Sequence, residues 1–267
     1  MSGMGERPIG VFDSGIGGLT VLKELLDHLP GESFVYFGDT ARVPYGTKSG
    51  DTVRRFSREN ARFLLERNVK SIVVACNTAS AEALPMLQRE FSVPIVGVIE
   101  PGVRAAVEAS GSGRIGIIGT AGTIRSGAYQ AGIAALRRDA DVTAAPCPLF
   151  VPLAEEGWTD HPVTEMVARE YLREFRERDI DTLVLGCTHY PLLKPVIGRV
   201  MGSLVRLVDS AVETAREMKR VIHSEDIAGG GGNGQFSVVL SDISPAFNDI
   251  ARHFLGRDIP EIELVGS

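Results

Sequence analysis

The sequence has little of what marks several classes of protein. It has three cysteines in 267 residues, widely spaced and without a CxxC pair, which argues against a disulfide scaffold or a cysteine metal site. No uncharged apolar run approaches the ~18 residues of a membrane span, and residues 1–7 lack the apolar core of a signal peptide. We therefore expect a cytoplasmic protein with reduced thiols and no membrane partner.

Clustered positive charge and metal motifs are also missing. The net charge is −6, with Lys and Arg mixed among acids, so we expect no nucleic-acid partner. Of five histidines, only His189 lies close to a cysteine. The others have no paired spacing for a metal, and we interpret them as surface residues: His28, His161, His223 and His253. We expect no metal site, and small metabolites remain as ligands.

Short apolar runs bounded by turn residues recur along the chain and alternate with helical patterns. Apolar residues recur at helical spacing over residues 51–67 and again over 163–175. Strands are predicted at Ile9–Phe12, Phe34–Phe37, Ser71–Ala75, Ile95–Ile99, Arg114–Ile118, Thr182–Gly186, Leu204–Val208 and Phe236–Leu240. This alternation predicts an α/β protein with mainly parallel, helix-flanked sheets.

One segment of the chain occurs twice. Residues 58–78 align without a gap with residues 169–189, which places Cys76 on Cys187. In both copies a charged amphipathic stretch leads into a short apolar run, then a cysteine followed by small polar residues. This pattern predicts a helix, a buried strand and a thiol at the carboxyl end of the strand.

The duplication extends beyond the cysteine segments. Residues 9–14 resemble residues 115–120, and residues 96–100 resemble residues 205–209. We therefore predict two similar domains related by a pseudo-twofold axis, with the active site in the cleft between them. The first comprises residues 1–100 plus 209–267 and carries Asp13 and Cys76. The second comprises residues 101–208 and carries Glu155, Cys187 and His189.

The tail after Asp209 is expected to pack back on the first half. It is predicted to contain a helix, a loop at residues 229–234, a strand, and a helix that begins at Ser244-Pro245 and stops at Gly256. The glycine run is not followed by a Gly-Lys-Ser/Thr signature, so we interpret it as a flexible loop and not as a phosphate site.

The paired cysteines carry the strongest chemical signal. A thiol at a strand end that opens onto a helix N-terminus meets free N–H groups, which favour the thiolate. Two such thiols facing one cleft could remove a proton from one face of a substrate and deliver one to the other. The alternatives are two buried apolar cysteines or a disulfide between Cys76 and Cys187. Cys147 has no counterpart in the other half and is expected to be structural.

Other candidates are weaker on their own. The Asp13-Ser14-Gly15-Ile16-Gly17-Gly18 turn follows a strand and opens a helix, so it suits an anion, although Asp13 could equally be a helix cap. Tyr45-Gly46 lies in a long polar loop, residues 38–49, which is typical of a binding loop. Glu155 ends an apolar stretch, where a solvated acid is the usual interpretation.

At these motifs the chain closely resembles the glutamate racemases of the aspartate/glutamate racemase family. The resemblance covers nearly the whole chain. It rests on VFDSGIGG (residues 11–18), GDTARVPYG (38–46), ACNTAS (75–80), FVPLAEEG (150–157) and LGCTHYP (185–191). Aspartate racemases commonly carry Glu after the second Cys-Thr, where this chain has His189.

The resemblance implies a cofactor-independent isomerase that interconverts L- and D-glutamate and supplies D-glutamate for peptidoglycan, and hence for cell shape. It implies that Cys76 and Cys187 exchange protons with the α-carbon, and that family members are often homodimers. It further implies that Asp13 assists Cys76, and that Glu155 and His189 assist the thiols. Contacts to the substrate are expected from Asp13, Ser14, Tyr45, Gly46, Asn77, Thr78, Thr188 and His189.

Three other functions remain open at the level of sequence. A racemase of another acidic amino acid, such as aspartate, could use the same scaffold. A thiol redox protein could form a reversible Cys76–Cys187 disulfide. Some glutamate racemases also bind DNA gyrase, but no segment of this chain indicates such a partner.

Overall fold

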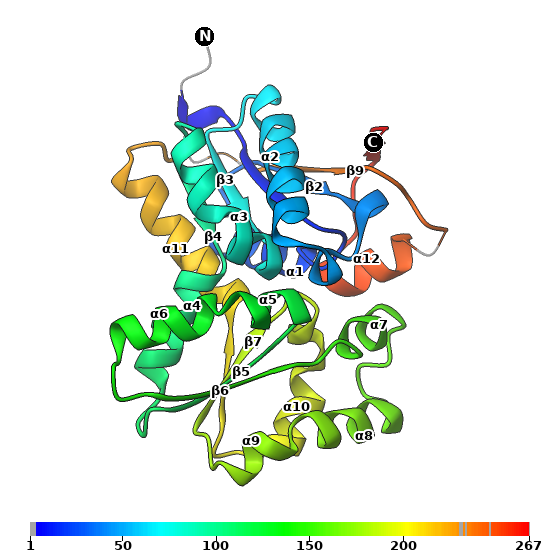
Figure 1. Ribbon diagram of the computed structural model, residues 1–267. Coiled ribbons are helices and arrows are strands. Elements are labelled where there is room, and N and C mark those ends of the chain that lie inside the picture. The colour runs from blue at the N-terminus through cyan, green and yellow to red at the C-terminus, as the bar shows by residue number, and fades with distance from the viewer. Residues whose placement is uncertain (1–3, 230–231, 233, 246, 267) are drawn as a thin grey trace.

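The strands of the chain form two separate parallel sheets. The computed structural model describes residues 4–229, 232, 234–245 and 247–266 (Figure 1). The strands are β1 (Ile9–Asp13), β2 (Phe34–Gly38), β3 (Ser71–Val74), β4 (Ile95–Gly97), β5 (Arg114–Gly119), β6 (Asp141–Pro146), β7 (Thr182–Gly186), β8 (Arg206–Asp209), β9 (Phe236–Leu240) and β10 (Ile262–Leu264).

The first sheet has the strand order β10-β9-β2-β1-β3-β4, with every pair parallel. Its central strands β1 and β3 are buried at every position, because a parallel sheet covered by helices on both faces excludes water from both. The pairing of β9 with β2 brings the C-terminal tail onto the first half, as predicted. In Figure 1 both chain ends lie on this half.

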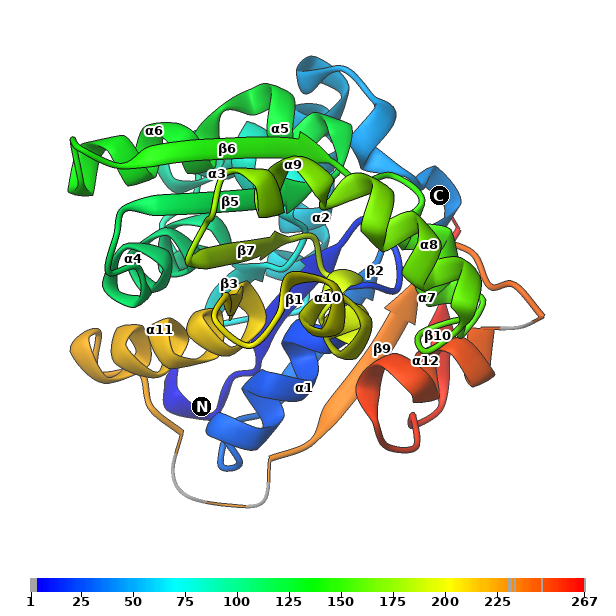
Figure 2. The same cartoon turned by 90° about the horizontal axis from the view of Figure 1, so that it is seen from below.

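The second sheet has the order β6-β5-β7-β8, again with every pair parallel (Figure 2). Strands β6, β5, β7 and β8 correspond, in this order, to β2, β1, β3 and β4 of the first sheet. Both halves therefore repeat the same strand order. The predicted fold class, two helix-flanked parallel sheets, is confirmed. The exact residue limits of the two domains stay a prediction.

Helices cover the faces of both sheets and fill the space between them (Figure 1). The α-helices are α1 (Leu19–His28), α2 (Gly50–Glu66), α3 (Asn77–Glu90), α4 (Ile99–Ala109), α5 (Ala121–Ser126), α6 (Ala128–Leu136), α7 (Phe150–Glu155), α8 (Pro162–Tyr171), α9 (Arg173–Glu177), α10 (Lys194–Met201), α11 (Ser210–Ser224) and α12 (Phe247–Leu255). Short 3₁₀ helices are η1 (Met4–Glu6), η2 (Thr40–Arg42), η3 (Tyr45–Thr47) and η4 (Tyr190–Leu193).

Each apolar run identified in the sequence forms a strand, with ends within two residues of the prediction. Two strands were not predicted, β6 and β10. Both lie at the edge of a sheet and bury little apolar surface, so their sequences lack the apolar signal of the central strands. The predicted helix over residues 51–67 is α2, whereas the pattern at 163–175 is split at Leu172 into α8 and α9.

The helical tail follows the sequence prediction. Helix α12 ends at Leu255, and Gly256 follows it with φ of 72°, a left-handed conformation in which glycine is unstrained. The predicted start at Ser244-Pro245 adjoins residue 246, which lies outside the described residues. So do residues 230, 231 and 233 of the predicted glycine loop. Within the described ranges, no helix is long and apolar enough to cross a membrane.

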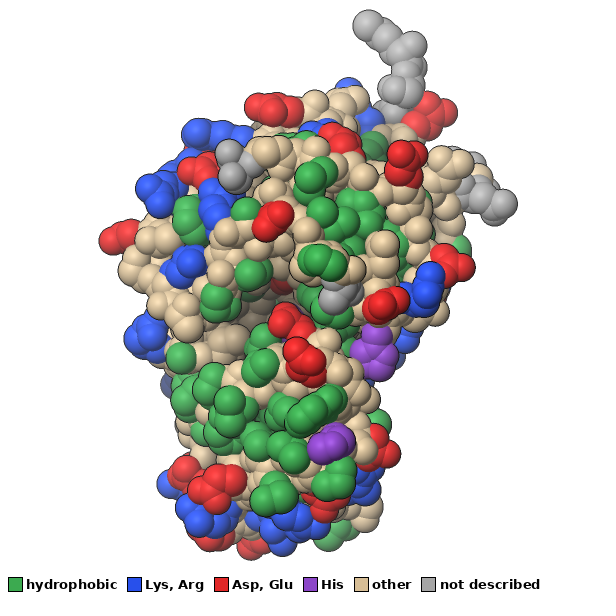
Figure 3. Space-filling view, turned by 90° about the vertical axis from the view of Figure 1, so that its right-hand side faces the viewer, with side chains coloured by type: hydrophobic (Ala, Val, Ile, Leu, Met, Phe, Trp, Pro, Cys, Tyr) green, Lys and Arg blue, Asp and Glu red, His purple; other side chains and the backbone are tan. Residues whose placement is uncertain are grey.

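One face of the second half carries exposed apolar side chains (Figure 3). They come from the segment around α7 and α8: Leu149, Trp158, Val163 and Met166, of which Met166 is 70% exposed. Trp158 stacks on His161, with 4.4 Å between ring centroids, so part of this surface is ordered by aromatic packing.

Candidate functional site

Cys76 lies at the end of β3 and forms the N-cap of α3, as predicted. Its Sγ accepts a hydrogen bond from the backbone N–H of Ala79 at 3.5 Å and lies 3.5 Å from Oγ of Ser14. The residue is 6% exposed. Burial, together with the charge of Asp13, raises the pKa of Cys76 to about 12 and outweighs the bond from the N–H of Ala79, which lowers it. The prediction that this helix N-terminus favours the thiolate is therefore wrong for Cys76, which is a protonated thiol at neutral pH.

Asp13 ends β1 beside Cys76. Its Oδ2 accepts a hydrogen bond from the backbone N–H of Gly15 at 2.9 Å, while Oδ1 is buried without a partner among the residues that the structure describes. Burial raises the pKa of Asp13, although the charge of His189 opposes the rise. Asp13 is not a helix cap, because α1 begins only at Leu19, after the glycine turn. Oδ1 is therefore the carboxyl oxygen that is available to groups at the site.

Cys187 follows β7 and lies against His189, which in turn contacts Glu155. Nδ1 of His189 is 3.8 Å from Sγ of Cys187, and Nε2 is 2.9 Å from Oε1 of Glu155. Burial alone would lower the pKa of His189, but the bonds to Cys187 and Glu155 outweigh it and raise this pKa to about 10. The resulting imidazolium places a positive charge beside the sulfur of Cys187.

No α-helix follows Cys187 directly, so the prediction of a helix N-terminus after both cysteines is correct for Cys76 and wrong for Cys187. A turn and the 3₁₀ helix η4 intervene before α10 begins at Lys194. Pro191 and Pro195 lack N–H groups, which weakens regular helical bonding over this stretch. At Cys187 the positive partner is therefore the imidazolium of His189.

The two cysteine segments meet where the carboxyl ends of the two sheets face each other. Oγ1 of Thr20, in the first half, donates to the backbone oxygen of Thr188 at 2.9 Å. Oγ1 of Thr78, two residues after Cys76, lies 2.9 Å from Oγ1 of Thr120 in the second half. Thus Asp13, Cys76, Cys187 and the residues that follow them come together, as the sequence predicts.

Thr120 was missed as a site residue, although the sequence held a signal for it. The alignment of residues 9–14 with 115–120 places Thr120 on Ser14, the hydroxyl nearest to Cys76. Thr120 caps α5 through a bond from the N–H of Thr123, and its side chain also lies against Gly46. It joins the Thr78 and Thr123 hydroxyls in one cluster.

The loop of Tyr45 and Gly46 reaches the same junction, but the tyrosine side chain points into the first half. Its hydroxyl donates to Asp39 and accepts from Nδ2 of Asn60 at 3.1 Å, and the residue is 1% exposed. This network holds the loop in place. Gly46 faces Thr120, where an added Cβ would come within 2.7 Å of the threonine Cβ.

The sequence analysis also made predictions about Cys147 and about a metal site. All three cysteines are free, and Cys147 is fully buried, with its Sγ 3.9 Å from the backbone oxygen of Ala145. Over the described residues, no three His, Cys, Asp or Glu side chains gather closely enough to hold a metal ion.

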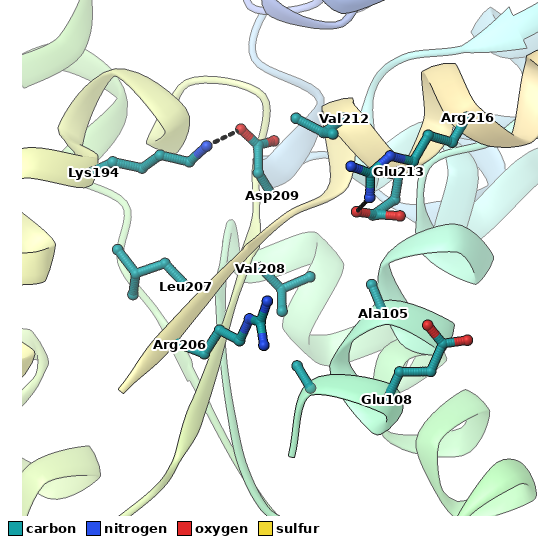
Figure 4. A pocket seen from close by; sticks show the side chains of 11 residues that line it. Ala105, Glu108, Lys194, Arg206, Leu207, Val208, Asp209, Val212, Glu213 and Arg216 are labelled. Carbon is teal, nitrogen blue, oxygen red and sulfur yellow. Dashed lines mark hydrogen bonds and ion pairs between the residues drawn. The ribbon is translucent and has the colours of Figure 1, made fainter. Parts of the chain in front are cut away.

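The cysteines are nearly inaccessible, since Cys187 is 5% exposed and Cys76 only slightly more. A separate cavity of about 490 Å³ lies between β8, α4 and α11 (Figure 4). Its wall includes the ion pair between Nζ of Lys194 and Oδ2 of Asp209, at 2.5 Å, as well as Arg206 and Glu108. Neither Cys76 nor Cys187 lines this cavity.

Comparison with known proteins gives consistent results. Residues 9–218 match the family described as Asp/Glu/Hydantoin racemase. The chain is 54% identical over 257 residues to a glutamate racemase of Geobacter metallireducens, covering 96% of this chain and 95% of that protein.

Two solved structures are also close. One is glutamate racemase from Thermus thermophilus in complex with β-chloro-D-alanine, with 48% identity and a TM-score of 0.89. The other is glutamate racemase from Francisella tularensis in complex with D-glutamate, with 38% identity and a TM-score of 0.93. In each case the match covers 98% of both chains.

Proposed function

The chain belongs to the Asp/Glu/hydantoin racemase family of isomerases, and we propose that it interconverts L- and D-glutamate by proton transfer between Cys76, Cys187 and the α-carbon. The observation that carries the proposal is the placement of two unlike thiol environments at one junction. Similarity to glutamate racemases over nearly the full chain supports the choice of substrate.

The proposed cycle begins with the proton on Cys76. Cys76 is a thiol, and the imidazolium of His189 lies 3.8 Å from Cys187, where it offsets negative charge on the sulfur. The thiolate of Cys187 takes the α-proton of one enantiomer, and the electron pair of the C–H bond remains on the α-carbon. Cys76 then delivers its proton to the opposite face, which leaves Cys76 as the thiolate. The reverse reaction follows the same steps with the roles exchanged.

Both partner groups assist these steps. Asp13, whose pKa is raised by burial, stands beside Cys76 and can exchange a proton with it as the thiol changes state. His189, held by Glu155, compensates the charge of Cys187. Charge developing at the α-carbon and its carboxylate requires preorganised donors, which the N-terminus of α3 and the side chains around it provide.

Contacts to the substrate come from the residues gathered at the junction. We assign this role to Asp13, Ser14, Asn77, Thr78, Thr188 and His189, and to the loop of Tyr45 and Gly46. The hydroxyl of Tyr45 is engaged by Asp39 and Asn60, so its contribution comes from the backbone. Thr120 joins them because of its contact with Thr78.

The wider role follows from the substrate. We propose that the enzyme works in the cytoplasm without a cofactor, supplies D-glutamate for peptidoglycan, and forms a homodimer. The exposed apolar side chains around α7 and α8 give the homodimer a first test. If Met166→Glu and Leu149→Glu leave the mass measured by light scattering unchanged, this face is not the dimer surface.

The decisive experiment incubates the reduced protein with L-glutamate in deuterated water. Circular dichroism follows optical activity and NMR follows the α-proton, without added cofactor. Both signals should decay. Cys76→Ser and Cys187→Ser should each slow the reaction by at least about 100-fold, as expected for loss of an acid or base group. If the α-proton of glutamate persists but that of aspartate exchanges, the proposal that glutamate is the substrate is wrong. Full activity in both serine variants would refute the two-thiol mechanism.

A further inference from the structure

Tyr129 reaches across the junction between the two halves without belonging to either cysteine motif. It is the second residue of α6 and is fully buried. Its hydroxyl donates to Oδ1 of Asn77, in the other half, at 2.7 Å. Asn77 is the residue directly after Cys76 and the first residue of α3. We propose that Tyr129 is a positioning residue that fixes the Asn77 amide for the substrate, an inference that rests on the proposed function.

The tyrosine ring is fixed by close packing. A Cβ added at Gly186, the residue before Cys187, would lie 3.1 Å from Cε2 of Tyr129. A Cβ added at Gly102 would lie 3.4 Å from Cε1 and from the hydroxyl oxygen. The ring is therefore held between α4 and β7, beside the residue that precedes Cys187. Because the ring cannot move freely, the position of its hydroxyl oxygen is set as well.

The hydrogen bond determines which end of the Asn77 amide remains available. The carboxamide has one acceptor oxygen and one donor nitrogen, and either could face the junction if the group rotated. Tyr129 occupies Oδ1. Nδ2 is buried and has no partner within the part of the chain that the structure describes. Leaving a buried N–H unpaired costs about 1–3 kcal/mol. A substrate carboxylate bound beside Cys76 would accept this bond.

The surroundings of Tyr129 keep it a donor. Burial raises its pKa, as do the charges of Asp209 and Cys187, while the nearby Ser210 side chain opposes the rise. The hydroxyl therefore keeps its proton and donates a hydrogen bond to Asn77. Asp209 is itself held by Lys194 at the cavity of Figure 4 and by the N–H of Ala211. The tyrosine thus lies among groups that are already fixed by other bonds.

The bond also couples the amide to the arrangement of the two halves. Asn77 moves with the first sheet, and Tyr129 packs on Gly186 of the second. If the halves separate to admit substrate, the bond breaks and the amide is released. Nδ2 is therefore oriented toward the substrate only when the two cysteine segments are together.

A double-mutant cycle tests this role. Wild type, Tyr129→Phe, Asn77→Ala and the double variant are compared in kcat/KM for L-glutamate and in the Kd for D-glutamate measured by calorimetry. Phenylalanine keeps the ring packing and removes only the hydroxyl. We expect Tyr129→Phe to lower kcat/KM by about 10-fold and to weaken D-glutamate binding in the wild-type background, the effect of one buried hydrogen bond. In the Asn77→Ala background, Tyr129→Phe should change kcat/KM and the Kd for D-glutamate by less than about 2-fold.

The control is Tyr171→Phe, which removes a hydroxyl that accepts from the N–H of Leu149 outside the junction. It should leave both constants unchanged. The proposal fails if Tyr129→Phe behaves as wild type, or if it costs the same factor with and without the Asn77 amide. If turnover of Asn77→Ala is too slow to measure, the four Kd values for D-glutamate provide the test of the proposal. A wild-type protein that does not racemise glutamate would refute the proposed function instead.

Discussion

Nε2 of His189 lies 2.9 Å from Oε1 of Glu155, while Nδ1 of the same imidazole lies 3.8 Å from Sγ of Cys187. His189 thus links the carboxylate of Glu155 to the sulfur of Cys187. The imidazole is buried, whereas the glutamate side chain is 41% exposed. The carboxylate therefore contacts water on one side and His189 on the other. It helps to keep the imidazole charged beside the sulfur.

Glu155→Gln should weaken the charge on His189 and so reduce proton transfer through Cys187. Losing this carboxylate removes one of the causes that raise the histidine pKa to about 10. We expect kcat to fall by about 10-fold and the alkaline limb of the pH–rate profile to move to lower pH. Glu156→Gln, the neighbouring exposed acid, is the matched control. An unchanged alkaline limb in Glu155→Gln would show that the contact does not tune His189.

The stability of the fold should decrease at alkaline pH in a way that depends on His189. Its pKa is about 10 in the folded protein and 6.5 as an unperturbed group. The charged histidine thus contributes stability that is complete below pH 6.5 and lost as the pH rises through about 10. Between these pH values, wild type should lose at least about 1 kcal/mol more of its unfolding free energy than His189→Asn. Urea titrations measure this, with His223→Asn as the surface control. Equal losses in wild type and His189→Asn would contradict the prediction.

Gly17→Ala should keep the halves from meeting. A Cβ at this position would lie within 2.5 Å of Nδ1 of His189 and would also contact Oγ1 of Thr188. We expect kcat/KM to fall by at least about 10-fold, since misplacement by 1 Å is enough for such a loss. Far-ultraviolet circular dichroism should be unchanged. Gly232→Ala, where an added Cβ meets nothing within 4 Å, serves as the control. Normal kinetics in Gly17→Ala would mean that the junction tolerates separation.

Lys70→Met should destabilise the protein without touching the site. Lys70 and Glu32 form an ion pair whose side chains are 0% and 6% exposed, and they also bond to the backbone of Gly5 and Gly229. Removing the lysine leaves a buried carboxylate, which costs about 3–5 kcal/mol of unfolding free energy. Arg169→Met breaks an exposed pair with Glu165 and should cost under about 0.5 kcal/mol. Similar losses of unfolding free energy in the two variants would show that burial of an ion pair does not determine the cost of breaking it.

Substrate entry should require the halves to open, because both cysteines are nearly inaccessible in this arrangement. We expect saturating D-glutamate to slow amide hydrogen exchange in the segments around Gly17 and Thr188. The distant edge strand β6 provides the internal control and should not change. Exchange that is identical with and without D-glutamate at the junction would refute closure.

The sequence alone determined the architecture of both halves. Central parallel strands are buried on both faces, so they appear as short apolar runs that can be located to within two residues. The duplicated segments then predicted that Cys76 and Cys187 occupy equivalent strand ends. The edge strands β6 and β10 were missed because their partly exposed positions carry no such pattern.

Only the tertiary structure decided how the two thiols differ. Equivalent sequence positions suggested equivalent helix N-termini, yet Cys76 caps α3 whereas Cys187 relies on His189 and Glu155. The contact between Tyr129 and Asn77 joins residues of different halves, and no local pattern links them. Periodicity and motif spacing report interactions within a strand or helix. The pKa of a buried group and the orientation of an amide depend on neighbours that only folding brings near.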